Sequence, residues 1–185
     1  MPTKGQKLVD KFTGDTIEFI ETSSDTNGER VTLKVTLRSK GQTVDDHIHL
    51  KQRETFKMLS GTMTYFLNGK QKDLNPGEEV VLPENEAHNH YNTKDEPAEY
   101  IQTIEPGIDV DLFLENLFGM INDGKVKEGK LPFLQAMVTG KYLESPSRLA
   151  AIPLGPQNFL INTIGPIARL FGYRAIYKKY TGVEK

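Results

Sequence analysis

The chain has neither cysteine nor tryptophan among its 185 residues. Without cysteine there is no disulfide framework, no thiolate nucleophile and no cysteine-ligated zinc or iron–sulfur site. The sequence also lacks an uncharged apolar run of about 18 residues, the length that a membrane-spanning helix needs. Its first residues lack the apolar core of a secretory signal. We therefore expect a cytoplasmic protein with one hydrophobic core.

A strong overall charge is absent too, because the net charge is only −2. This balance argues against nucleic acid as an obligatory partner. The charge is unevenly spread along the chain. Residues 141–185 carry seven Lys or Arg and two Glu, so their net charge is +5, which leaves −7 for residues 1–140. The two parts of the chain therefore differ in kind.

The first part of the chain has the pattern of an all-β domain. Residues 1–15 are polar and predict a flexible lead-in. From Thr16, apolar and polar residues alternate as in half-buried strands, with turns rich in Gly and Asn between them. Strands are expected near residues 16–21, 31–38, 47–51, 54–59, 62–68, 79–82, 87–92 and 98–104. Many short strands of this kind predict a mainly β sandwich or barrel over residues 16–106.

After Pro106 and Gly107 the hydrophobic period changes to that of helices, which predicts a helical extension over residues 107–185. Asp109 is expected to cap a first helix that ends near residues 122–124. Pro132 precedes a second predicted helix, from Phe133 to Tyr142. Residues 158–180 predict one or two amphipathic helices with a basic end, in a segment that prolines punctuate.

The four histidines form two His-x-His pairs, His47 with His49 and His88 with His90. Residues i and i+2 of a strand share a face, so each pair can direct both rings at one point. Glu54 follows closely enough for its carboxylate to turn back to His47 and His49, and His88 can supply a fourth ligand. Such a set suits one divalent transition metal, Fe, Mn, Ni, Cu, Co or Zn, and leaves coordination positions open.

These residues resemble the two sequence motifs of the cupins. The first motif matches Gly41-QTVDD-His47-Ile-His49-LKQR-Glu54-TFKMLS-Gly61 without a departure. The second matches Gly77-EEVVL-Pro83-Glu84-Asn85-Glu86-Ala87-His88-NHY-Asn92, with one departure, Asn85 in place of Gly. Asn tolerates a left-handed backbone, so we expect the turn at Asn85 to be preserved. The resemblance covers about residues 16–105.

The resemblance implies an antiparallel, jelly-roll-like cupin β-barrel in which His47, His49, Glu54 and His88 bind a metal. It also favours a homodimer. Cupins include dioxygenases, isomerases, decarboxylases and proteins that only bind small ligands, so the fold does not fix the reaction.

We expect a metal-dependent enzyme that acts on a small organic molecule, either a dioxygenase-like oxidoreductase or an isomerase. Glu54 and His90 are the catalytic candidates: Glu54 as ligand and base, and His90 because it shares the face of His88 and imidazole titrates near neutral pH. The alternative for His90 is a packing role beside Tyr91. The alternatives for the whole protein are a small-ligand-binding cupin without catalysis and an interaction protein that works through its tail.

Phe56 and Met58 share the alternation of Glu54 and should face the barrel interior. The tail from Ala150 to Tyr180 combines apolar residues with Arg and Lys. This composition fits contact with an anionic membrane surface, or packing on the barrel or across a dimer interface. We favour packing, because apolar surface usually finds a protein partner.

Overall fold

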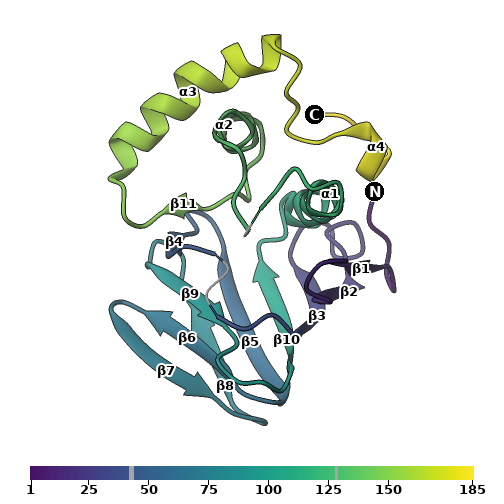
Figure 1. Cartoon of the computed structure of the whole chain (residues 1–185), viewed down its shortest axis with the longest axis vertical. Coiled ribbons are helices and arrows are strands. Elements are labelled where there is room, and N and C mark those ends of the chain that lie inside the picture. The colour runs from purple at the N-terminus through teal and green to yellow at the C-terminus, as the bar shows by residue number, and fades with distance from the viewer. Residues whose placement is uncertain (42–43, 128) are drawn as a thin grey trace.

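Two antiparallel β-sheets share one apolar core in the computed structural model, which describes residues 1–41, 44–127 and 129–185 (Figure 1). The first sheet has the strand order β1-β2-β3-β10-β5-β8 and the second β11-β4-β9-β6-β7. The strands are β1 Lys7–Val9, β2 Thr16–Glu21, β3 Val31–Leu37, β4 His47–Ile48, β5 Arg53–Ser60, β6 Met63–Leu67, β7 Lys70–Leu74, β8 Glu79–Leu82, β9 His88–Tyr91, β10 Ala98–Glu105 and β11 Arg148–Leu149. The predicted mainly β, antiparallel architecture is confirmed.

Alternating side chains on the inner faces of the strands fill the core. β10 buries every second residue from Ala98 to Ile104, and β5 buries Glu54, Phe56 and Met58. The expectation that Phe56 and Met58 face the interior is therefore confirmed. Because Glu54 shares this face, its carboxylate lies inside the barrel rather than in solvent.

The prediction of a flexible lead-in over residues 1–15 is wrong for Lys7–Val9, which forms strand β1. This strand pairs with β2 in an antiparallel register that sets Leu8 opposite Ile17. Leu8 packs against the main core cluster, and this apolar contact holds a segment whose neighbours are polar. The first sheet is therefore one strand wider than the sequence pattern predicts.

Four helices lie together at one end of the sheets (Figure 1). They are α1 Val110–Asn122, α2 Phe133–Tyr142, α3 Leu154–Leu170 and α4 Lys178–Thr181. The helix expected from Phe133 to Tyr142 is confirmed, with Pro132 at its N-cap. The last helical segment was expected to begin at residue 158, but α3 begins at Leu154. It includes both Pro156 and Pro166. Pro156 lies in the first turn, where a backbone N–H has no partner within the helix in any case.

The sequence predicts that Asp109 caps α1, but this prediction is wrong for its side chain. Asp109 precedes α1 and makes no capping hydrogen bond with its side chain. Its carboxylate accepts hydrogen bonds instead from the backbone N–H groups of Glu144 and Ser145, and it lies 3.5 Å from the Nζ atom of Lys185. Asp109 thus ties the start of α1 to the loop after α2 and to the C-terminal residue.

The C-terminal part of the chain also contributes a strand to the barrel, which the sequence pattern did not predict. β11 pairs with β4 so that Leu149 lies opposite His47 and Arg148 lies opposite Ile48. β4 in turn pairs with β9. The helical segment is therefore joined directly to the strand that carries His47 and that ends just before His49.

Candidate metal centre

Three strands bring the predicted ligands together at one point inside the barrel. His47 lies on β4 and His49 directly after it, Glu54 lies on β5, and His88 lies on β9 as the register partner of His47. One ligand atom from each of His47, His49, Glu54 and His88 lies within 4.8 Å of the others. Ligand–metal bonds in proteins are about 2 Å long, so this spacing suits a single ion.

Backbone carbonyl groups fix the orientation of two of the rings. The Nδ1 atom of His47 lies 3.0 Å from the carbonyl oxygen of Asp45, and that of His88 lies 2.9 Å from the carbonyl oxygen of Glu86. When Nδ1–H donates to a carbonyl oxygen, the proton-free Nε2 is left as the ligand atom. Both rings are thus held in the tautomer that metal binding requires.

The cluster favours the protonation states that bind metal. Burial lowers the pKa of His47 to about 4 against the opposing effect of Glu54, and burial also lowers the pKa of His49. Both imidazoles are therefore neutral at neutral pH. Burial by itself would raise the pKa of Glu54, but the neighbouring histidines lower it below its ordinary value. The cluster therefore offers neutral imidazoles and a carboxylate.

Gln102 on β10 holds the Glu54 carboxylate in place. Its Nε2 atom donates a hydrogen bond to Oε1 of Glu54 across 3.0 Å, and both side chains are buried. Gln102 lies outside both sequence motifs. The alternation of β10 could have identified it, because a polar residue at an inward position of a strand calls for a polar partner.

Several buried polar atoms of the cluster have no hydrogen-bond partner among the described residues. They include Nε2 of His88, Oε2 of Glu54 and Nδ1 of His49. The Nε2 atom of His88 lies 3.5 Å from Oε2 of Glu54, too far for a good hydrogen bond. Leaving such groups buried and unpaired is costly, and a bound divalent cation would satisfy Nε2 of His88 and Oε2 of Glu54 at once. The residues therefore fit the metal that the motifs imply.

His90 also lies on β9 and points into the barrel, on the same face as His88. Its ring packs 4.6 Å from that of Phe56 and 5.9 Å from that of Tyr100, measured between centroids. Its Nδ1 atom is buried without a partner among the described residues. Burial lowers the pKa of His90 to about 4, while the charge of Glu54 opposes this shift. His90 thus presents a free ring nitrogen beside the cluster, outside the group of four candidate ligands.

The one departure from the second motif leaves the local backbone intact. Asn85 adopts a φ of 62°, the left-handed conformation that the sequence analysis expected Asn to tolerate there. Its backbone N–H donates to the carbonyl oxygen of His49 across 2.8 Å. The turn before β9 is thereby bonded to the ligand segment after β4. Residues 42 and 43 of the first motif lie outside the described residues.

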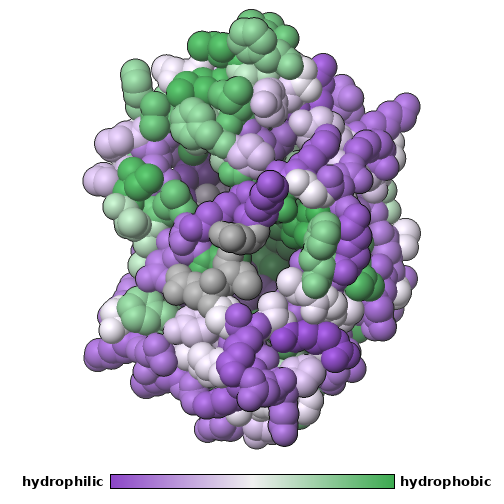
Figure 2. All heavy atoms as spheres, in the orientation of Figure 1, coloured by the Kyte–Doolittle hydropathy of each residue, from purple (hydrophilic) through white to green (hydrophobic). Residues whose placement is uncertain are grey.

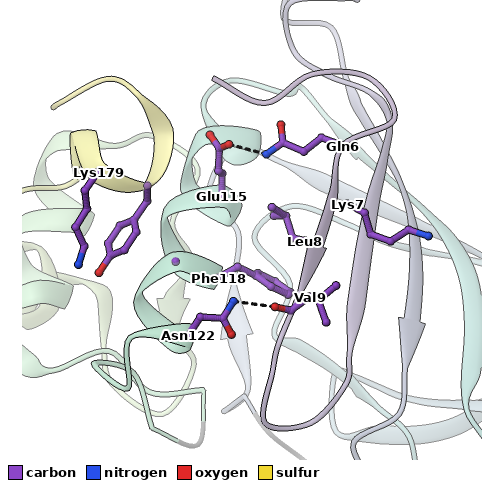
Figure 3. Close-up of a pocket in the computed structure, with 10 residues that line it drawn as sticks. Gln6, Lys7, Leu8, Val9, Glu115, Phe118, Asn122 and Lys179 are labelled. Atoms are coloured by element: carbon purple, nitrogen blue, oxygen red, sulfur yellow. Dashed lines mark hydrogen bonds between the residues drawn. The ribbon is translucent and has the colours of Figure 1, made fainter.

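A separate hollow of about 310 Å³ lies between β1, α1 and α4, and no ligand candidate lines it (Figure 3). Polar groups on its walls bond to one another: Gln6 donates to Glu115, and the Asn122 side chain donates to the carbonyl oxygen of Val9. These bonds tie the first strand to the first helix. The hollow is therefore a seam of mixed polar and apolar residues between elements, and it contains none of the four candidate ligands.

Comparison with known proteins agrees with this geometry. Residues 33–104 match the family model described as "Cupin domain". Two curated proteins are similar: a quercetin 2,3-dioxygenase of Bacillus subtilis, 29% identical over 57% of this chain and 30% of its own length, and the epoxidase atD of Aspergillus terreus, 26% identical over 73% of this chain and 46% of its own length. A solved structure titled as a sugar phosphate isomerase from a cupin superfamily, from Silicibacter pomeroyi, covers 54% of this chain and 70% of its own at 13% identity, with a TM-score of 0.46.

The paired antiparallel sheets, the two motifs and the family match together define the class of this region: residues 33–104 form a cupin domain. His47, His49, Glu54 and His88 of that domain form a cluster consistent with one metal ion. The chain spans less than half the length of either curated relative. The domain match and the cluster therefore establish the fold of residues 33–104 and the candidate site, and leave the reaction to be argued from the residues.

Proposed function

We propose that this cupin is a metal-dependent oxygenase that acts on a small organic molecule. The observation that carries the proposal is the convergence of three imidazoles and one carboxylate on a single buried point, with Nε2 of His88 and Oε2 of Glu54 unpaired. The names of both curated relatives, a dioxygenase and an epoxidase, support oxygen chemistry over isomerisation.

Four protein ligands would hold the ion and leave room in its coordination shell for substrate. A bound divalent transition metal supplies Lewis acidity and, when redox-active, electrons for oxygen chemistry. The protein's own part is to fix the ligands: Gln102 orients Glu54, and two backbone carbonyls orient His47 and His88. The apolar rings of Phe56 and Tyr100 exclude water from the space beside the cluster.

His90 is the residue placed to move a proton in this proposal. Its Nδ1 atom has no partner among the described residues, and its ring lies on the same face of β9 as the ring of His88. Nδ1 of His90 can therefore take a proton from a substrate hydroxyl group that approaches the metal. Glu54 stays a ligand in this scheme, because the hydrogen bond from Gln102 restrains it.

A pair of variants on one strand tests the proposal. His88→Ala removes a ligand, so the metal content measured by elemental analysis should fall sharply. His90→Ala removes no ligand, so the metal content should stay at the wild-type level while substrate-dependent oxygen uptake falls by about 10²-fold or more. Quercetin, named in one relative, and a panel of small phenols and quinones serve as substrates.

Two results would count against the proposal. Equal metal content in wild type and His88→Ala would mean that the cluster is not the metal site. Metal binding together with thermal stabilisation by a small molecule, but without oxygen uptake under any condition, would identify the protein as a binding cupin instead.

A further inference from the structure

Helix α3 buries only one of its faces. Its inner face packs against α2 through Ile161, Gly165 and Ala168, all buried, and the Gly165 position touches Met137 and Lys141 of α2. The outer face is bare. The exposed apolar side chains along and beside it are Ile152, Leu154, Phe159, Leu160, Ile167, Leu170 and Phe171. The structure leaves this outer surface unpacked against any described part of the chain.

This outer surface is large for an exposed apolar patch. Phe159 is 68% exposed, Leu170 87% and Phe171 77%. An aromatic side chain has roughly 150–250 Å² of surface, so the two phenylalanines alone present about 250 Å². The largest patch on an ordinary monomer is about 300–600 Å², and patches of that size commonly mark an interaction site. Figure 2 shows hydrophobic residues gathered at the same end of the molecule, over α3.

The segment that carries this surface has charges of one sign. Residues 145–183 contain no Asp or Glu, and Arg169 is the one charged residue within α3. Two cations beside the helix have no carboxylate partner among the described residues: Lys141 donates to Asn162 of α3, and Arg169 of α3 lies over the ring of Tyr142. An apolar face flanked by unpaired cations is complementary to a surface that is both apolar and anionic.

We propose that the outer face of α3 docks onto an anionic lipid surface, with the helix lying in the plane of the membrane. With 17 residues α3 is about 25 Å long. No helix among the described residues is long and apolar enough to cross a bilayer, so insertion is confined to the apolar face. Phe159, Ile167 and Leu170 would enter the acyl boundary while the cations contact lipid phosphates.

The charge pattern favours lipid over a second copy of the chain as the occupant. A two-fold dimer through this face would bring the same cations of both copies together, because such an interface pairs a surface with itself. Like charges that face each other across an interface are unfavourable. A lipid surface that contains phosphatidylserine offers negative charge beside an apolar layer, and so matches both properties of the helix.

Vesicle co-sedimentation of the full chain tests this inference. Wild type should sediment with vesicles of phosphatidylcholine and phosphatidylserine, more weakly with phosphatidylcholine alone, and less at high ionic strength, which screens the charges. The double variant Phe159→Ser/Phe171→Ser should bind at least about tenfold more weakly, because two exposed rings are lost. Lys141→Gln/Arg169→Gln should reduce the preference for phosphatidylserine.

A matched control distinguishes vesicle binding through α3 from non-specific binding through any exposed aromatic ring. Phe12, 66% exposed, lies in the turn between β1 and β2, so Phe12→Ser removes a ring as exposed as that of Phe159 but should leave vesicle binding unchanged. An equal loss with Phe12→Ser, or no sedimentation of wild type with either vesicle, would overturn the proposal. A third result would also overturn it: wild type forms a dimer in analytical ultracentrifugation, Phe159→Ser/Phe171→Ser is a monomer, and wild type does not bind vesicles. Oxygen uptake is not part of this test, so its failure is distinct from failure of the proposed reaction.

Discussion

The crossing of α2 and α3 gives a sharp stability prediction, because α3 contains two Gly-Pro pairs in different surroundings. A Cβ atom built at Gly165 would lie 2.8 Å from both the carbonyl oxygen of Met137 and the Cβ atom of Lys141. A Cβ atom built at Gly155 would meet nothing within 4 Å. The substitutions Gly165→Ala and Gly155→Ala therefore make the same chemical change with and without a neighbour in the way.

The magnitude follows from the difference between the two variants. Each Gly→Ala change gains up to about 1 kcal/mol of helix propensity. Each alanine would also precede a proline, which disfavours the helical backbone at that residue. These two effects occur in both variants and therefore largely cancel in the comparison. What remains is the overlap at Gly165. A separation of 2.8 Å is more than half an ångström short of ordinary contact, and backbone on α2 cannot rotate away. Overpacking of this kind costs about 1–3 kcal/mol.

Thermal unfolding followed by circular dichroism measures this difference. A change of 1 kcal/mol shifts the Tm of a chain of this size by about 2–4 °C, so Gly165→Ala should melt roughly 2–12 °C below Gly155→Ala. Amide hydrogen exchange should accelerate in α2 and α3, while the metal content stays unchanged because the cluster is in the barrel. Equal Tm values for the two variants would refute the close approach of α2 and α3.

Two further predictions concern the barrel. Arg30 donates two hydrogen bonds to the Glu21 carboxylate and helps to lower its pKa from the ordinary 4.5 to about 2, so the interaction stabilises the fold above pH 4.5 and is lost as the pH falls towards 2. Because this ion pair is partly exposed, Glu21→Gln should lower the free energy of unfolding in urea by only about 1 kcal/mol at neutral pH. The difference in this free energy between variant and wild type should become smaller in acid. A difference that does not change with pH would contradict the ion-pair account. Gly61 has a φ of 71°, and a Cβ atom built there would overlap the carbonyl oxygen of Pro97, whereas Gly69, with a φ of 76°, has open space. Gly61→Ala should therefore destabilise by about 2–5 kcal/mol and Gly69→Ala by about 1–2 kcal/mol, and similar urea midpoints for the two would show that the turn can move away from Pro97.

Local chemistry in the sequence was enough to predict that the four candidate ligands lie together. The two-residue spacing of His47 and His49 has the same consequence on any strand, because alternate side chains share a face. The left-handed turn at Asn85 was predictable for a similar reason, since it depends on the conformational range of one residue. The start of α2 follows from the fixed φ and missing N–H of Pro132, which again is a local property.

Contacts between distant segments decided what the sequence pattern could not. β1 and β11 are two or three residues long, too short for a periodic signal, and they exist because they pair with β2 and β4. Asp109 looked like a helix cap, but backbone N–H groups from the loop after α2 compete for its carboxylate. The role of Gln102 depends on where Glu54 lies on the neighbouring strand.

The C-terminal segment illustrates the same division. Residues 145–183 contain apolar residues and cations but no Asp or Glu. This composition predicts an amphipathic surface element. Which of its apolar residues are buried was not predictable, because a helix that is apolar on most sides has no preferred inner face until a neighbour packs on it. The close approach of α2 at Gly165 makes that choice, and it turns Phe159, Ile167 and Leu170 outward.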